Sequence, residues 1–166
     1  MKENKMENEK HRPKKGGEIK MRTNLLIKLV DKDGKIKEER LFKNLIVTAG
    51  KNSAIKQVLG DTSGGGQPAK FNYVGIGTGA TTEVAGDTAL QTEIGTRQQD
   101  TSPDFPSTGR GDVIVTFAAG NGTGAIVEAG LLNASSAGTL LARKTFSTIN
   151  KGASDSLQIT WQITLS

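Results

Sequence analysis

The stretch that decides the fold is Asp155-Ser-Leu-Gln-Ile-Thr-Trp-Gln-Ile-Thr-Leu165, near the carboxyl end of the sequence. Every second position from Leu157 onward is apolar, and Ser, Gln and Thr occupy the positions between. A β-strand has a period of two, so this alternation predicts a strand with one apolar and one polar face. We therefore expect Ile159, Trp161 and Ile163 to lie in the core of a β domain.

Further strands are expected at short spacing along the chain. Segments 25–30 and 35–42 flank Asp33-Gly34, which predicts a β-hairpin whose two central turn residues can both take positive φ. The other segments that we predict to be strands are 45–47, 71–76, 113–117 (ending at Phe117, a further core residue), 125–132, 139–146 and 157–165. This spacing, with 21 glycines for turns, predicts an all-β chain folded as an antiparallel β-sandwich or flattened barrel.

One or two short helices are expected within this framework. In the segment 48–60, Ile55, Val58 and Leu59 fall on one helical face, and Gly60 suits a left-handed cap. These features predict the first helix.

The second helix is suggested by a shorter signal. Thr88-Ala-Leu-Gln91 has the spacing of a capping box, and Glu93 and Arg97 stand four residues apart, where they would pair on a helix. The segments 61–70 and 100–112 are rich in Gly, Pro and Ser, and we expect them as outward-facing loops.

Positive charge is concentrated at the amino end. Residues 1–45 carry 14 Lys and Arg against 8 Asp and Glu, whereas residues 46–166 carry 8 against 9. Residues 1–22 are too polar to offset their own ordering entropy, so we expect a flexible basic arm followed by one domain over residues 23–166. The basic residues of this arm are Lys2, Lys5, Lys10, Arg12, Lys14, Lys15, Lys20 and Arg22.

The partners that these charges favour are limited. The arm can meet an acidic neighbouring protein or nucleic acid, whereas the nearly neutral body is not expected to bind nucleic acid. No apolar run approaches the roughly 18 residues needed to cross a bilayer, so no membrane partner is expected.

The sequence offers little material for catalysis. His11 is the only histidine and there is no cysteine, so we expect no histidine-based triad, no cofactor and no metal site. Gly75-Ile-Gly-Thr-Gly79 lacks the spacing of a dinucleotide fingerprint and is interpreted as turn chemistry. Arg110-Gly-Asp112 matches a cell-adhesion tripeptide but lies where a loop enters a strand. Hydrolysis by carboxylates alone would need two acidic residues side by side, and nothing in the sequence places together any two of Glu83, Asp87, Glu93, Asp104, Asp112 and Glu128. The chain is therefore expected not to be an enzyme.

Glu128 interrupts an otherwise apolar strand. If its face is buried, the carboxylate needs a cationic partner, and Arg97 and Arg143 are the candidates for a buried ion pair. If the strand lies at an edge, Glu128 faces water. Both readings stay open at this level.

Taken together, several motifs resemble structural proteins of tailed-bacteriophage virions. They are Phe71-Asn-Tyr-Val-Gly-Ile-Gly-Thr-Gly-Ala80, Asp87-Thr-Ala-Leu-Gln-Thr-Glu93 with Arg97, Gly124-Ala-Ile-Val-Glu-Ala-Gly-Leu-Leu-Asn133, Leu140-Leu-Ala-Arg-Lys-Thr-Phe146, Ile149-Asn-Lys-Gly152 and Ile159-Thr-Trp-Gln-Ile-Thr-Leu-Ser166. Their order is similar to that in the β-sandwich attachment domain of phage tail-fibre and collar proteins. The resemblance covers about residues 44–166.

The resemblance implies a non-enzymatic virion protein, made in the host cytoplasm. The sequence shows no coiled-coil or collagen-like extension, so a tail, neck or collar adaptor or attachment protein is expected rather than a host-binding fibre. Its partners would be other virion proteins (tail, portal or neck, or major capsid protein) and copies of itself in a homo-oligomer. A capsid decoration or cement protein is the alternative, and an adhesion or carbohydrate-binding module is an alternative of a different class.

Overall fold

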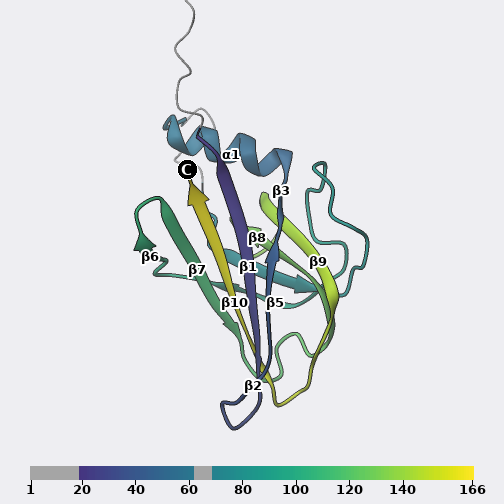
Figure 1. Cartoon of the computed structure of the whole chain (residues 1–166). Coiled ribbons are helices and arrows are strands. Elements are labelled where there is room, and N and C mark those ends of the chain that lie inside the picture. The colour runs from purple at the N-terminus through teal and green to yellow at the C-terminus, as the bar shows by residue number, and fades with distance from the viewer. Residues whose placement is uncertain (1–18, 62–68) are drawn as a thin grey trace, which may run out of the picture.

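The computed structural model describes residues 19–61 and 69–166, which form two antiparallel sheets packed face to face (Figure 1). This arrangement confirms the expected β-sandwich. The arm residues Lys2, Lys5, Lys10, Arg12, Lys14 and Lys15 lie outside the described residues.

The first sheet, sheet A, contains the strand that decided the fold. Its order is β2 (Ile36–Lys43), β1 (Met21–Val30), β10 (Ser156–Leu165), β7 (Arg110–Phe117) and β6 (Asp104–Ser107). Strand β10 lies in the middle, paired along its whole length with β1, from Met21 opposite Leu165 to Val30 opposite Ser156. The two ends of the described sequence are therefore neighbours in one sheet.

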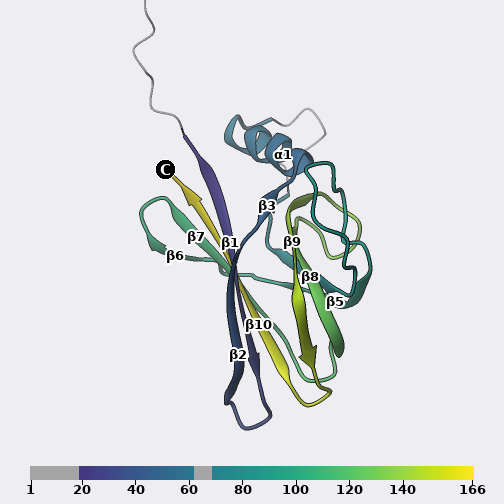
Figure 2. The same ribbon diagram turned by 45° about the vertical axis from the view of Figure 1, so that its right-hand side comes forward.

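The second sheet, sheet B, has the order β3 (Leu45–Ile46), β9 (Leu140–Lys151), β8 (Gly124–Leu132), β4 (Tyr73–Gly77) and β5 (Glu93–Gln99). Figure 2 shows the two sheets close together at the end that holds the β1–β2 turn and splayed apart at the other end. Helix α1 (Thr48–Val58) lies at that splayed end.

The chain passes from one sheet to the other at Asn44. Strand β2 pairs with β1 in sheet A up to Lys43, and after Asn44 the chain pairs with β9 in sheet B as β3. Beside this crossing, Phe42 stacks on Phe146 with ring centroids 5.3 Å apart. The fold therefore has one side partly closed, as in a flattened barrel.

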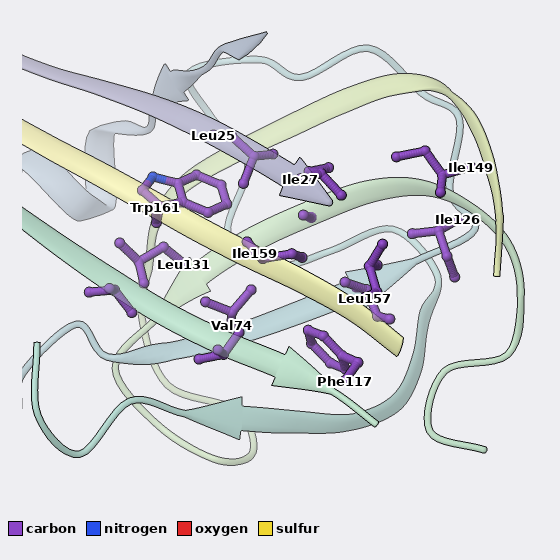
Figure 3. Close-up of a cluster of buried hydrophobic side chains, with 14 of the residues drawn as sticks. Leu25, Ile27, Val74, Phe117, Ile126, Leu131, Ile149, Leu157, Ile159 and Trp161 are labelled. Carbon is purple, nitrogen blue, oxygen red and sulfur yellow. The ribbon is translucent and has the colours of Figure 1, made fainter. Parts of the chain in front are cut away.

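The core lies between the sheets (Figure 3). Ile159, Trp161 and Phe117 are fully buried, as expected from the alternating pattern. Ile163 is only partly buried and packs against the edge of this core. It occupies the same face as Trp161, but farther along β10 toward the end where the sheets separate.

The first helix is present, but its packing differs from the simplest expectation. The apolar face formed by Ile55, Val58 and Leu59 is 53–77% exposed. The helix instead contacts sheet B through Gly50, where a Cβ atom would collide with the backbone of Leu141. Close backbone approach at a glycine, rather than an apolar stripe, seats this helix.

The expected second helix at residues 88–91 is wrong. This segment is irregular, and residues 93–99 form strand β5. Glu93 and Arg97 do form the expected ion pair, with Oε1 and Nε 2.6 Å apart, but on a strand. The segment 88–92 follows the outer surface of sheet B because a buried carboxylate binds its backbone, which a helical signal of four residues does not outweigh.

Two turn regions also differ from expectation. The β1–β2 hairpin is present, but only Gly34 has a positive φ, of 81°, and Asp33 does not. Asp31 closes this turn by accepting hydrogen bonds from the N–H groups of Asp33 and Lys35. The segment 100–112, expected as a loop, contains β6 and the beginning of β7.

Candidate functional site

The best-defined polar cluster of the described residues surrounds Glu128 on the outer face of sheet B. Glu128 is fully buried and pairs with Arg143, with Oε2 2.8 Å from Nη2. Arg143 is itself fully buried and also pairs with Asp87, with Nη1 2.9 Å from Oδ2. The buried reading of Glu128 is therefore confirmed, and of the two candidate partners Arg143 is the one it contacts.

Arg97, the other candidate partner of Glu128, binds different residues. Beyond its pair with Glu93, it donates to the carbonyl oxygens of Ala134 and Ala137 at 2.9 and 2.8 Å. It therefore anchors the β8–β9 turn rather than the Glu128 cluster.

The Glu128 carboxylate also binds the backbone of the segment that covers it. It accepts hydrogen bonds from the N–H groups of Gly79 (3.1 Å), Gln91 (3.0 Å) and Thr92 (2.8 Å). Arg143 adds a bond to the carbonyl oxygen of Thr81 at 2.9 Å. A buried ion pair with this many partners is electrostatically satisfied, and it attaches residues 79–92 to sheet B.

Glycines make room for this covering segment. On the outer face of sheet B, a Cβ at Gly75 would lie 2.7 Å from Glu93 Oε1, and one at Gly130 would lie 2.9 Å from Leu90 Cδ2. A Cβ at Gly77 would meet the Thr92 carbonyl oxygen. Gly75 and Gly77 belong to strand β4, so their role is close packing and not the turn chemistry that we expected.

A second carboxylate, Glu83, attaches the same segment to β9. It contacts the ammonium of Lys144 and accepts hydrogen bonds from the Thr145 N–H (3.1 Å) and hydroxyl (2.5 Å). Burial raises the pKa of Glu83, but these hydrogen bonds outweigh burial and lower its pKa to about 2. Glu83 is therefore ionised in the folded protein at neutral pH and well below it.

The sequence named Asp87 and Glu83 only as carboxylates and did not predict their contacts with β9, and it gave no expectation of the glycine surface. One signal was available: Glu128 and Gly130 are two residues apart on one strand and so share a face. A face that combines a carboxylate with glycines indicates a backbone segment packed closely on top. The side chains of Glu128 and Arg143 are fully buried and that of Asp87 nearly so, and their charges are paired with one another, so we interpret the cluster as a structural clamp.

The end of the sandwich that holds α1 differs from the buried Glu128 cluster, because it exposes apolar side chains. We call it the terminal face, and it comprises Ile19, Ile55, Val58, Leu59, Phe105 and Leu165. Figure 1 places α1, the start of β1, the end of β10 and the β6–β7 hairpin together at this end. A cavity of about 520 Å³ beside Phe105 and Leu165 lies on it.

The described basic residues of the expected arm, and the adhesion tripeptide 110–112, belong to the strands of sheet A or continue their pairing. Lys20 exchanges backbone hydrogen bonds with Ser166, and Arg22 is part of β1, so the sheet begins earlier than the expected boundary of the arm. Arg110 pairs with Asp112 at 2.6 Å within β7. This hydrogen bond keeps the pKa of Arg110 above its ordinary value, and the Asp112 side chain is largely buried, so the adhesion tripeptide is not displayed.

Within residues 19–61 and 69–166, no three His, Cys, Asp or Glu side chains are arranged to hold a metal ion. No helix in this part of the chain is long and apolar enough to cross a membrane. Comparisons with protein-family models, with curated proteins and with solved structures each return no match.

Proposed function

We propose that this chain is a non-enzymatic structural protein of a tailed-bacteriophage virion, a tail, neck or collar adaptor or attachment protein that docks into a symmetric assembly. The observation that carries the proposal is the terminal face. Six of the ten large apolar side chains exposed in the described structure belong to it. Apolar side chains gathered on one end of a small domain are typical of a surface that another protein covers.

The basic arm adds to this docking surface. The arm precedes Ile19 in the sequence, and Ile19 belongs to the terminal face. In a symmetric array each contact is repeated, so modest affinity at one subunit suffices for stable attachment. The arm would supply attraction to an acidic neighbour, and the apolar residues would supply burial.

A carbohydrate-binding or adhesion module is less well supported. Such modules stack sugars on exposed aromatic rings, but Trp161 is fully buried and Tyr73 is partly covered. Phe105 is the one exposed aromatic side chain in the described residues.

The test uses particles that lack this protein. Purified wild-type chain should bind them, and a Val58→Ser, Leu59→Ser double variant should bind at least about tenfold more weakly, which is about 1.4 kcal/mol. Leu41→Ser is the matched control, because Leu41 is also exposed but lies opposite Leu26, in the middle of β1, and is not one of the residues of the terminal face. The Leu41→Ser variant should bind like the wild type.

Two results would contradict the proposal. One is wild-type protein that does not associate with any particle, and the other is equal incorporation of the double variant and the wild type. Separating heads from tails before the assay distinguishes the adaptor from the capsid decoration protein.

A further inference from the structure

Strand β1 has a free edge at its beginning. Its pairing with β2 stops at Asn24 opposite Lys43, because the chain then crosses to sheet B, so no strand of sheet A adjoins Met21–Thr23 on that side. Lys20 and Ser166 exchange backbone hydrogen bonds, and hydrogen-bonding directions alternate along a strand. The N–H and C=O groups of Met21 therefore point away from β10, toward this free edge.

Strand β3 presents a second free edge opposite the first. It pairs with β9 on one side only. The N–H of Val47 donates to the carbonyl of Leu141 at 3.0 Å, so by the same alternation the N–H and C=O of Ile46 point away from β9. A cavity of about 630 Å³ lies between these edges and is lined by residues of both, including Met21 and Ile46. We call it the β1–β3 slot.

Buried polar side chains without partners line the same slot. Thr23 is only 5% exposed, and its hydroxyl has no hydrogen-bond partner. The side-chain amide of Asn44 is buried at the crossing between the sheets, and neither its nitrogen nor its oxygen is bonded. Buried polar groups are nearly always satisfied in native proteins, so this concentration indicates a missing partner.

The charge of the slot restricts what that partner can be. Arg22, Lys43 and Lys51 line it, and among its described lining residues there is no Asp or Glu. Arg22 donates to the hydroxyl of Ser166, and none of the three cations forms an ion pair with a described carboxylate. A carboxylate-rich ligand is therefore favoured.

We propose that the β1–β3 slot binds an extended acidic peptide segment of a neighbouring protein, as an added strand between β1 and β3. Such strand addition draws affinity from main-chain hydrogen bonds, which the backbones of Met21 and Ile46 can supply on the two sides. The three cations would select acidic side chains. Free backbone edges favour a peptide over a nucleic acid, which has no N–H and C=O ladder to pair with them.

The inference rests on the proposed function, which it deepens by naming the chemistry of the neighbour. The probe is a fluorescently labelled ten-residue peptide of alternating Glu and Val, and its binding to the full chain is followed by anisotropy at low salt. Lys43→Glu combined with Lys51→Glu should weaken binding by at least about tenfold. Lys35→Glu is the matched control at the opposite end of the sandwich, and it should change binding less than about twofold.

A second pair of variants tests the backbone contact. Met21→Pro removes the N–H that points into the slot, and the first residue of a strand tolerates proline. It should weaken binding of the Glu-Val peptide, whereas Met21→Ala, which keeps the N–H, should not. Both variants must retain the wild-type circular dichroism spectrum, and a misfolded Met21→Pro leaves the lysine variants as the deciding comparison.

Several results would overturn the inference. The first is that the Glu-Val peptide does not bind, or that a Lys-Val peptide binds equally well. The second is that another occupant is preferred: single-stranded DNA binds more tightly at the same slot, or the chain self-associates with rising concentration and the Lys43 and Lys51 variants abolish this self-association. The third is that the peptide binds only after residues 1–18 are deleted, which would make the arm the occupant. Peptide binding without particle incorporation would contradict the proposed function and leave the slot intact. Incorporation without peptide binding would do the reverse.

Discussion

At the scale of single residues, Glu128 is the side chain whose position most affects stability. It is a fully buried charge, and five donor groups from Arg143 and three backbone amides surround it. The cost of removing a charge from water is high, so each of these partners is needed. The pair links β8 to β9 and at the same time holds the segment that covers sheet B.

Removing this carboxylate should destabilise the protein strongly. Glu128→Ala leaves Arg143 buried with only Asp87 as an ionic partner, so we expect a loss of about 3–5 kcal/mol in the free energy of unfolding. Urea unfolding measures it. The control is Glu39→Ala, which removes a half-exposed carboxylate 3.4 Å from Lys28 and should cost under about 1 kcal/mol. Equal losses for the two variants would contradict the clamp.

Glu83 predicts how stability depends on pH. Its pKa falls from 4.5 in the unfolded chain to about 2 in the folded protein, so its contribution to stability is complete above pH 4.5. That contribution should be lost as the pH falls from 4.5 to about 2. Glu83→Gln lacks it at every pH, so the difference in melting temperature between wild type and variant should be largest near pH 6 and should become small near pH 2. A difference that stays constant would contradict the assignment.

Trp161 offers a test of the core at a single position. It is fully buried and its indole N–H has no hydrogen-bond partner. Trp161→Ala should cost about 3–5 kcal/mol, measured by urea unfolding. Trp161→Phe keeps a ring and removes the unpaired N–H, so it should cost clearly less. In the wild type, acrylamide should quench the tryptophan fluorescence poorly, and efficient quenching would contradict burial.

At the scale of elements, the outer face of sheet B is built to be covered. Strands β4 and β8 place Gly75, Gly77 and Gly130 on that face, and residues 87–93 pack directly over them. This explains why a glycine-rich strand precedes an irregular segment, since any side chain at these positions would push the segment away.

A single methyl group should disturb this packing. Gly77→Ala would bring a Cβ onto the Thr92 carbonyl and within 2.5 Å of Glu128 Oε1, so we expect a loss of about 1–3 kcal/mol. Gly86→Ala is the control, because a Cβ there would meet no atom within 4 Å. Thermal unfolding compares the two variants, and a Gly77→Ala protein as stable as the Gly86→Ala protein would show that the segment can move aside without cost.

At the scale of the whole molecule, the start and the end of the described sequence complete one sheet. Strand β1 pairs with β10 from Met21 to Val30, and Lys20 continues the ladder to Ser166. The terminal face is therefore assembled from segments that are far apart in sequence, and truncation at either end should affect it.

Two deletions separate the arm from the sheet. Residues 1–18 are mainly polar, and Met1 and Met6 are their large apolar residues. Deletion of these residues should therefore change the melting temperature little. Deletion of residues 1–22 also removes Met21 and Arg22 from β1, together with their pairing to β10, so it should lower stability by about 1–2 kcal/mol. Identical melting curves for the two deletions would show that these residues add nothing to the sheet.

Local pattern alone determined the class of fold and most of its strands. The alternation over 157–165 predicted β10 and the burial of Trp161 and Ile159, because a period of two places alternate side chains on one face whatever the strand pairs with. The β1–β2 hairpin followed from the Asp33-Gly34 turn signal between the segments 25–30 and 35–42. These features depend only on residues that are close together in the sequence, so the sequence is enough to predict them.

Only the tertiary structure decided the partner of Glu128, the conformation of residues 88–99 and the β1–β3 slot. Arg97 and Arg143 were equal candidates in sequence, and the register of β8 with β9 brought Arg143 to the carboxylate. A helical signal at Thr88 was outweighed by hydrogen bonds to Glu128, nearly forty residues away in the chain. The slot exists because β2 leaves sheet A at Asn44, and the pairing choice of a strand is settled by long-range contacts that no local window contains.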